Sequence, residues 1–365
     1  MFENKKIRKI KPYTLSTPEA WNFNNDDEVL KLDWNEATIK PSPEVKKKIS
    51  RIISSGRLNW YPNINNIELI NKIANYNDVK TNQVQYFASS DCLHEYIVRA
   101  FIEDSDKVLS ISPTYDNFRA VAESNGANVE FYDLDENFCL NFEKLDFDIK
   151  VIKPKVVYIV NPNNPTGTLH SSDDLLKLIT NNQNVLFIVD EAYYEFSKET
   201  VSTYISKLNN LLISRTFSKA FALASFRIGY LISNKKNIEI INRIRNPKNI
   251  SLFAQEAAIA ALNDVEYTEK YVKSIDDAKK IFFKFLSSLN WLEPVIGKGN
   301  FIFIKIKNLK IKVALIKHLK SDKIFVRDYG HIQKTKNYIR ITIGVKSQME
   351  KVSYSIEQFV KEQIK

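Results

Sequence analysis

Residue types that many functional sites require are scarce in this sequence. Its 365 residues include only two cysteines, Cys92 and Cys139, which exclude a disulfide framework and give no zinc-ligand spacing. We expect no metal site, because no pair of histidines has the spacing of metal ligands; the four are His94, His170, His318 and His331. The eight glycines form neither a dinucleotide-binding loop nor a P-loop, which argues against a nucleotide-dependent enzyme.

Long apolar runs are also absent. No run approaches the roughly 20 residues that a membrane-spanning helix needs, and residues 1–6 lack the apolar core of a signal peptide. We therefore expect a cytoplasmic protein with no membrane partner. The net charge of +10 suits anionic small molecules or nucleic acid. Because the lysines are spread along the chain without interleaved aromatic residues, we do not expect nucleic acid as a partner.

The apolar pattern predicts an α/β fold. Seven short apolar runs alternate with amphipathic stretches, as in a mostly parallel central sheet flanked by helices; the runs cover residues 85–88, 108–111, 129–132, 156–160, 185–189, 211–213 and 228–232. After about residue 235, helices predominate, followed by short strands and a last helix at 348–360. We therefore predict an N-terminal segment (1–40) that packs with the small domain, a large ligand-binding domain (41–247) and a smaller α+β domain (248–365).

Polar residues able to do chemistry follow four of the predicted strands. They are residues 89–91, 161–167, 190–193 and 216–219. The carboxyl ends of parallel strands line one crevice of an open sheet, and ligands bind there. We therefore expect these four segments to form one site.

Lys219 is the residue on which this site depends. It follows the apolar run 211–214, so its position is fixed and its apolar neighbours partly desolvate it. Desolvation disfavours the ammonium form and leaves a free amine, which can attack a carbonyl carbon and form a Schiff base. Thr216, Ser218 and Arg227 would then be donors around a phosphate. A basic strand-to-helix loop without such a role is the alternative.

One ligand would explain the strand-end residues together: an aldehyde with a ring nitrogen, a phenolic oxygen and a phosphate. Asp190 would pair with the ring nitrogen and keep it protonated. Tyr193 and Asn164 would donate hydrogen bonds to the phenolate. Each has a structural alternative, because Asp190 could cap a helix, Tyr193 could be a core residue and Asn164 could form a turn.

The remaining contacts of this ligand also come from strand ends. Tyr115 would supply an aromatic face to stack on the ring. Ser90 and Asp91 precede an amphipathic helix and offer capping geometry, with free backbone N–H groups for a phosphate. A plain helix cap is the alternative. The phosphate would be held by Ser90, Ser218 and Arg227.

These motifs resemble a known family. Asn-Pro-Thr-Gly at 164–167, Asp-Glu-Ala-Tyr at 190–193 and Ser-Lys at 218–219 with Arg227 resemble the signature of fold-type I pyridoxal-phosphate aminotransferases of class I/II. More narrowly, the chain resembles the histidinol-phosphate aminotransferase family, through residues 12–13, 58–62, 215–221, 326–328 and 339–342. The resemblance implies pyridoxal 5′-phosphate as the cofactor, bound by the large domain.

The resemblance also implies roles for individual residues. Lys219, Asp190 and Tyr193 would be catalytic, and Asp91 and Thr216 would join the cofactor-binding set. Tyr61 would reach the cofactor phosphate of a neighbouring subunit, which implies a homodimer. The substrate would be held by Arg340 at its α-carboxylate, by Arg327 and Tyr13 at its phosphate, and by Asn35.

The sequence departs from the family at two places. Ser89 and Cys92 stand where the family has Gly and Glu, and Ala37-Thr38-Ile39 replaces Pro-Tyr-Gly. The second change lies on the substrate side and leaves room for a smaller phosphorylated partner such as dihydroxyacetone phosphate.

We therefore predict a transaminase that moves an amino group between glutamate, with 2-oxoglutarate as its product, and a phosphorylated ketone, aldehyde or amino alcohol. Lys219 would move the proton at the substrate α-carbon. One alternative is a phosphoserine or phosphothreonine decarboxylase, which would keep the same residues. A non-catalytic basic binding protein on the same fold is another, although binding alone does not need the lysine.

Overall fold

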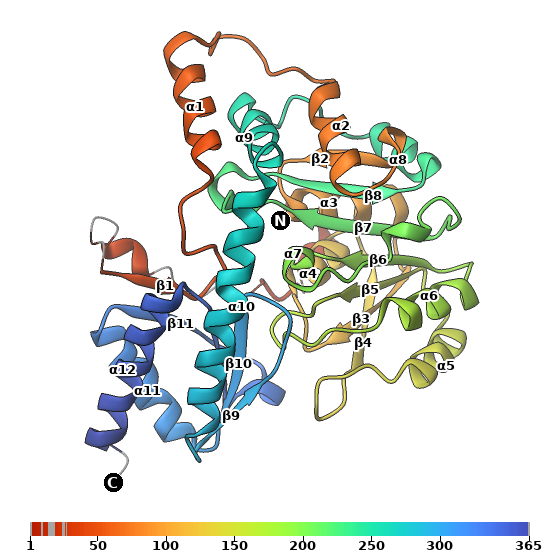
Figure 1. The fold of residues 1–365 in the computed structure, drawn as a ribbon. Helices are drawn as coiled ribbons and strands as arrows, with labels where there is room; N and C mark the ends of the chain where they lie inside the picture. Colours follow the sequence, from red (N-terminus) through yellow and green to blue (C-terminus); the bar gives the residue numbers. More distant parts are fainter. Residues whose placement is uncertain (1, 9, 14–18, 24–25, 27, 364–365) are drawn as a thin grey trace.

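The computed structural model describes residues 2–8, 10–13, 19–23, 26 and 28–363. Its centre is a seven-stranded sheet in the order β2-β8-β7-β6-β5-β3-β4 (Figure 1). β8 is antiparallel to both of its neighbours, and every other pair is parallel. The strands are β2 (Val84–Phe87), β3 (Lys107–Ser112), β4 (Asn128–Asp133), β5 (Val156–Val160), β6 (Leu186–Asp190), β7 (Leu211–Thr216) and β8 (Gly229–Ser233). The predicted mostly parallel α/β fold is confirmed.

Both faces of this sheet are covered, which explains the nearly continuous apolar runs of its strands. Along β5, Tyr158 and Val160 face one core and Val157 and Ile159 face the other. The helices that contribute to the first core are α3 (Ser90–Phe101), α4 (Asn117–Ser124) and α8 (Lys235–Asn242). Those that contribute to the second are α1 (Pro43–Ser55), α2 (Ile67–Tyr76), α5 (Phe142–Ile152), α6 (Ser172–Asn181) and α9 (Leu252–Leu262). Because successive side chains of a strand point to opposite faces of the sheet, each strand contributes apolar side chains to both cores.

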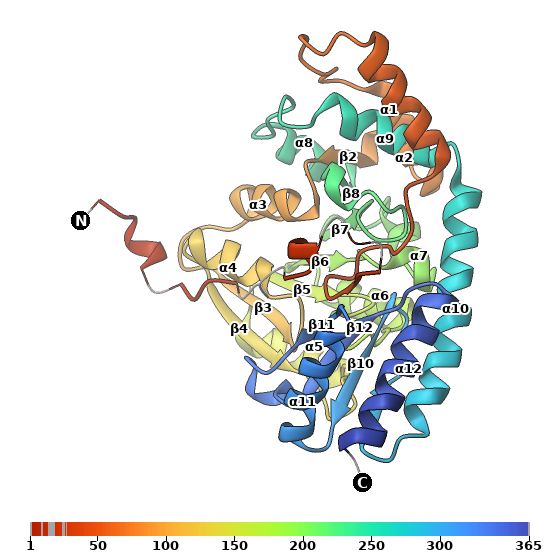
Figure 2. The same ribbon diagram turned by 90° about the vertical axis from the view of Figure 1, so that its left-hand side faces the viewer.

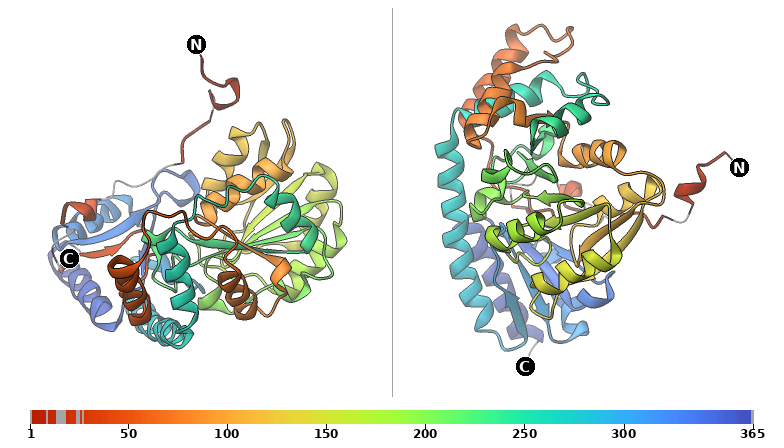
Figure 3. Two further views of the ribbon diagram at one scale, coloured as in Figure 1. Left: turned by 90° about the horizontal axis from the view of Figure 1, so that it is seen from above. Right: turned by 90° about the vertical axis from the view of Figure 1, so that its right-hand side faces the viewer.

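A second, five-stranded sheet has the order β1-β11-β12-β10-β9. Its strands are β1 (Leu30–Leu32), β9 (Leu292–Val295), β10 (Phe301–Ile306), β11 (Ile324–Asp328) and β12 (Tyr338–Thr342), and its core includes residues of α10 (Val265–Ser287), α11 (Leu309–Ser321) and α12 (Lys346–Gln363). β1 pairs in parallel with β11, so the N-terminal part of the chain contributes an edge strand to this sheet. Seen from above, the blue strands of this sheet lie beside the green and yellow strands of the large one (Figure 3). The domain boundaries stay a proposal.

Two segments connect distant parts of the structure. α10 packs on α9 and also on β9 and α12, so it spans from the large sheet to the small one (Figure 1). The short helix η1 (Lys5–Ile7) lies against α4, where Lys6 donates to the carbonyl of Asn125 (3.1 Å; Figure 2). Within the described ranges, no helix combines the length and apolar character that crossing a membrane requires.

Candidate active site

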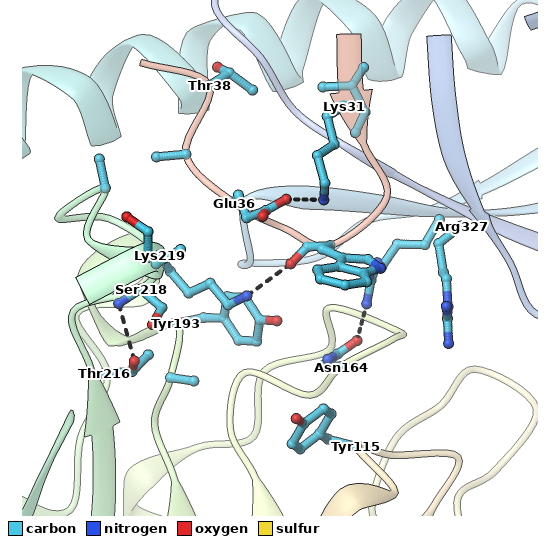
Figure 4. A pocket seen from close by; sticks show the side chains of 18 of the residues that line it. Lys31, Glu36, Thr38, Tyr115, Asn164, Tyr193, Thr216, Ser218, Lys219 and Arg327 are labelled. Atoms are coloured by element: carbon cyan, nitrogen blue, oxygen red, sulfur yellow. Dashed lines mark hydrogen bonds and ion pairs between the residues drawn. The ribbon is translucent and has the colours of Figure 1, made fainter. Parts of the chain in front are cut away.

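A cavity of about 830 Å³ lies between the two sheets. The carboxyl ends of β5, β6 and β7 open into it, and the small sheet closes the other side (Figure 4). Thirteen predicted site residues line it: Tyr13, Ser90, Asp91, Tyr115, Asn164, Asp190, Tyr193, Thr216, Ser218, Lys219, Arg227, Arg327 and Arg340. Asn35 and Tyr61 are not among the lining residues. The residues predicted from the strand ends and those predicted from the family resemblance thus line one cavity, although they are up to 327 positions apart (340 − 13).

Lys219 follows β7 directly and points into this cavity (Figure 4). Its Nζ donates a hydrogen bond to the backbone carbonyl of Trp34 (2.9 Å). Burial, and then the nearby Arg340 guanidinium, lower the pKa of Lys219 to about 8. The free amine, which a nucleophile or proton carrier requires, is therefore much more populated near neutral pH than in an ordinary lysine.

Asp190 ends β6 and is buried among donors. Its Oδ1 accepts from the backbone N–H of Ala192 (3.0 Å), and its Oδ2 accepts from the hydroxyl of Tyr158 (2.9 Å). Burial raises the pKa of Asp190, while the contacts with His94, Tyr158 and Ala192 oppose that shift. These donors favour the carboxylate, which is the form that can pair with a protonated ring nitrogen.

Tyr158 was missed by the sequence argument because it lies inside the apolar run of β5. A buried tyrosine hydroxyl normally needs a hydrogen-bond partner, and this is the signal that could have drawn attention to it. The partner is the carboxylate at the end of the neighbouring strand.

Tyr193 is held at the cavity wall by a residue of the N-terminal segment. Asn35 Nδ2 donates to the Tyr193 hydroxyl (2.9 Å), and Asn35 Oδ1 accepts from Thr342 Oγ1 (3.1 Å). The ring of Tyr193 packs edge-to-face on Phe301, with 5.2 Å between the centroids. Asn35 was predicted to bind substrate. That role stays a prediction. Asn35 is buried and is not among the residues that line the cavity, and its bond to Tyr193 can orient the tyrosine.

The N-terminus of α3 forms one end of the cavity. The first N–H groups of a helix lack intrahelical acceptors, which makes them ready donors to an anion. Ser89 caps this helix by accepting from the backbone N–H of Cys92 (3.2 Å), and its φ of 90° lies in the region that favours glycine. Gly229 lets β8 approach closely, because a Cβ there would stand 2.6 Å from the backbone nitrogen of Ser90.

Asp91 organises the side chains around that helix end. It accepts from the hydroxyl of Tyr115 (2.9 Å) and from Asn117 (3.3 Å), and it pairs with Arg227 at 3.4 Å. The arginine also donates to the carbonyl of Ala224 (3.0 Å). Thr216 accepts from the backbone N–H of Ser218 (3.1 Å), which fixes the turn that precedes Lys219. This end of the cavity therefore combines a helix N-terminus, two hydroxyl side chains and a guanidinium.

A second cationic group lies on the small sheet. Arg327 of β11 and Arg340 of β12 are directly opposite partners in the antiparallel pair, and each is only 5% exposed. Arg340 donates to the hydroxyl of Tyr329 (3.0 Å), to the carbonyl of Asp33 (2.6 Å) and to Asn164. Among the described residues, no carboxylate lies within ion-pair distance of Arg340. Like charges directly opposite on a sheet are unfavourable, so this arrangement is suited to an anionic ligand.

Tyr13 and Tyr329 complete this side of the cavity. Tyr13 packs edge-to-face on Tyr115, with 5.6 Å between the centroids. Burial raises the pKa of Tyr13 to about 12, although Arg327 and Arg340 oppose the shift. Tyr13 therefore keeps its proton and can donate a hydrogen bond. Tyr329 was not predicted, because nothing in the sequence distinguishes it from the other tyrosines.

The segment that departs from the family lies at the cavity wall. Ala37, Thr38 and Ile39 all line it. Lys31 forms ion pairs with Asp33 (2.9 Å) and Glu36, as Figure 4 shows for the second pair. Its ammonium also lies over the ring of Trp34, 4.3 Å from the centroid. The sequence argument missed Lys31, Trp34 and Glu36, because their approach to Lys219 depends on how the N-terminal segment folds back.

Tyr61 lies elsewhere. It is 78% exposed on the segment between α1 and α2, and its ring has the ammonium of Lys248 above it at 4.8 Å. It does not reach the cavity of its own chain, so its predicted contact with a cofactor requires a second subunit. That role stays a prediction.

The residues of the cavity fit pyridoxal 5′-phosphate. The partly neutral amine of Lys219 can react with the cofactor aldehyde, and the buried carboxylate of Asp190 can pair with the ring nitrogen. The N-terminus of α3 and the guanidinium of Arg227 can bind the phosphate. Asn164 and Tyr193 lie between these groups and line the same cavity. Nowhere in the described part of the chain do three or more potential ligand side chains gather as a metal site would need.

Comparisons with known proteins agree with this site. Residues 27–357 match the family model described as aminotransferase class I and II. A dihydroxyacetone phosphate transaminase of Campylobacter jejuni is 44% identical over 367 aligned residues, which cover 100% of this chain and 98% of that protein. A histidinol-phosphate aminotransferase of Ruminiclostridium cellulolyticum is 33% identical, covering 94% of this chain and 93% of the relative.

A solved structure has the same fold. The crystal structure of histidinol-phosphate aminotransferase from Sinorhizobium meliloti in complex with pyridoxal-5′-phosphate superimposes with a TM-score of 0.89. The match covers 99% of this chain and 98% of that one at 23% identity. At 23% identity this structural similarity shows only that the two proteins share a fold. The family itself is shown by the family model, which matches residues 27–357.

Proposed function

The chain belongs to the class I and II aminotransferase family, and from this premise we propose that it transfers an amino group from glutamate to a small phosphorylated ketone, with dihydroxyacetone phosphate as the acceptor. It is a pyridoxal-phosphate-dependent aminotransferase. When bound, the cofactor supplies an aldehyde that carries the amino group and a ring that accepts electrons. The choice of acceptor rests on the transaminase relative at 44% identity. The histidinol-phosphate aminotransferase relative supports a phosphorylated substrate more generally.

The observation that carries this proposal is the pairing of Arg327 with Arg340 across β11 and β12. Both guanidinium groups are buried at the same cavity as Lys219. Guanidinium groups bind carboxylate and phosphate through paired hydrogen bonds. Arg340, which lacks a carboxylate partner among the described residues, would take the α-carboxylate of glutamate. Arg327, with the protonated hydroxyl of Tyr13, would take the phosphate of the acceptor.

The other residues bind and move protons. Lys219, as a free amine, would take the proton from the substrate α-carbon and return it. Its hydrogen bond to the Trp34 carbonyl holds the amine at the cavity. Asp190 would hold the proton of the ring nitrogen, and Tyr193 and Asn164 would hydrogen-bond the phenolic oxygen. Ser90, Ser218, Arg227 and the N-terminus of α3 would bind the cofactor phosphate.

We further propose a cytoplasmic homodimer. Six large apolar side chains between α1 and the start of α2 are more than a third exposed; they are Ile53, Leu58, Trp60, Tyr61, Ile64 and Ile67. Exposed apolar groups of this kind are typical of a protein interface. A second copy would bury them and could bring Tyr61 to the cofactor phosphate of the neighbouring subunit. The cytoplasmic location is supported by the two free cysteines.

The function is tested by following the amino group. The purified protein, loaded with cofactor, is mixed with glutamate, and its absorbance is followed for conversion to the amine form. Dihydroxyacetone phosphate is then added, and the reverse conversion and the aminated product are measured. Unphosphorylated dihydroxyacetone is the matched control, and we expect it to react at least tenfold more slowly. No response to glutamate would remove the transaminase proposal, and evolution of CO₂ from phosphothreonine would replace it with the decarboxylase.

A further inference from the structure

His94 is a buried imidazole to which the proposed mechanism gives no role. It belongs to α3, the helix whose N-terminus lies at the phosphate end of the cavity, and it is 0% exposed. Its Nε2 lies 3.1 Å from Ser214 Oγ and 3.6 Å from Asp190 Oδ2. The rings of Phe118 and Tyr158 pack edge-to-face on it, each with 5.6 Å between centroids. These rings leave the imidazole little freedom to turn away from the carboxylate.

The contacts of His94 determine which nitrogen carries the proton. Nδ1 is buried and has no hydrogen-bond partner among the described residues. A proton on Nδ1 would be a buried donor without an acceptor, which is costly. Both polar neighbours of Nε2, the hydroxyl of Ser214 and the carboxylate of Asp190, can accept. The favoured form is therefore the neutral imidazole with its proton on Nε2.

We propose that His94 is a positioning residue, which presents its Nε2–H to Asp190 and Ser214 and so keeps the Asp190 carboxylate charged and correctly oriented toward the ring nitrogen of the cofactor. The proposal rests on the proposed role of Asp190. The hydroxyl of Tyr158 and the backbone N–H of Ala192 donate hydrogen bonds to this carboxylate. His94 Nε2 is a third polar group that faces it, at 3.6 Å from Oδ2, just beyond hydrogen-bond distance. It ties α3, β6 and β7 to one another at the centre of the site.

The alternative is that His94 only fills space in the core. A leucine would then serve almost as well, whereas a positioning role requires a donor. His94→Leu removes the donor and keeps an apolar side chain, and His94→Gln places an amide N–H near the position of Nε2. His170→Leu is the matched control, because His170 is also buried with an unpartnered ring nitrogen, whereas its ring packs on Phe142 and has no contact with Asp190 like that of His94.

The first measurement is the Kd of pyridoxal phosphate for the cofactor-free protein, in the wild-type and Asp190→Asn backgrounds. We expect His94→Leu to weaken binding about fivefold in the wild-type background, because the contact at 3.6 Å is a polar contact longer than a hydrogen bond to a charged group. His94→Gln should stay within about threefold of wild type, and His170→Leu should not change Kd. In the Asp190→Asn background, His94→Leu should cause no further loss, because the carboxylate through which it acts is gone. Equal losses in both backgrounds, or an unchanged Kd in His94→Leu, would overturn the proposal.

A second measurement needs no variant and stands even if His94→Leu does not fold. The ¹⁵N resonances of the His94 ring in the cofactor-free wild-type protein should report a neutral imidazole with the proton on Nε2. A doubly protonated ring, or a proton on Nδ1, would contradict the assignment. Neither readout depends on the amino acceptor. If the loaded wild-type protein failed to react with glutamate, the proposed function would be lost while the Kd comparison still decided the role of His94.

Discussion

Replacing Arg327 by alanine should weaken selectively the reaction with the phosphorylated acceptor. Arg327 is 5% exposed, so its charge acts where water screens little. A charge-assisted hydrogen bond of this kind contributes about 1.5–3 kcal/mol. Its loss corresponds to a decrease of about ten- to a hundredfold in kcat/KM for dihydroxyacetone phosphate.

The melting temperature of Arg327→Ala is measured beside its activity, so that a loss of stability is not read as a loss of phosphate binding. Arg327 is the direct cross-strand partner of Arg340, so the substitution removes an unfavourable contact between like charges, and it also removes the contact of the guanidinium with the Tyr329 ring at 5.9 Å. Arg327→Lys should lie between wild type and alanine, because lysine keeps the charge but loses the planar pair of donors.

The assay compares kcat/KM for dihydroxyacetone phosphate and for unphosphorylated dihydroxyacetone, with glutamate as the donor. The unphosphorylated ketone should be a poor substrate for the wild type and should change little in the variant. Equal losses for both ketones would refute the reasoning, since Arg327 would then not bind the phosphate.

Four further outcomes are expected. Borohydride reduction of the loaded protein, followed by peptide mapping, should place the cofactor on Lys219; a label on another lysine would refute the assignment. Asp190→Asn should still bind the cofactor, although more weakly than wild type, and should lower turnover by orders of magnitude; undiminished turnover would make the residue structural. In the cofactor-free protein, Lys219→Met should be more stable than wild type at pH 7. The pKa of Lys219 is about 8 in the folded protein and about 10.4 in the unfolded chain, so folding disfavours the protonated lysine. Thermal melts should show the advantage of the variant shrinking as the pH rises from about 8 to about 10.4. Light scattering should find a dimer, and a fully active monomer would exclude the crossing of Tyr61 between subunits.

The sequence predicted the large sheet well, because its strands are buried on both faces and read as uninterrupted apolar runs. The positions of Lys219 and Asp190 followed from the same fact, since each comes at the end of such a run. β1 and β9 were not predicted. β1 is only three residues long, and β9 includes a glutamate and a proline, so neither forms a recognisable apolar run.

Residues that act through tertiary contacts could not be predicted from local pattern. Tyr158 lies inside an apolar run, and His94 was considered only as a metal ligand; only the fold shows that both approach Asp190. The sequence did not indicate that Asn35, in a left-handed backbone conformation (φ 58°), bonds to Tyr193, and its contact with substrate stays a prediction. Nothing in the sequence indicated that the Trp34 carbonyl accepts from Lys219, because these two residues are 185 positions apart and only folding brings them together.

The central claim is that one cavity accepts an amino group from glutamate and passes it to a phosphorylated ketone. The most direct measurement is to incubate the loaded protein with ¹⁵N-glutamate and dihydroxyacetone phosphate and to analyse the products by mass spectrometry. The account predicts that ¹⁵N appears in the aminated triose phosphate in equal amount to the 2-oxoglutarate formed. Formation of 2-oxoglutarate without ¹⁵N in the triose phosphate, or no reaction with glutamate at all, would contradict it.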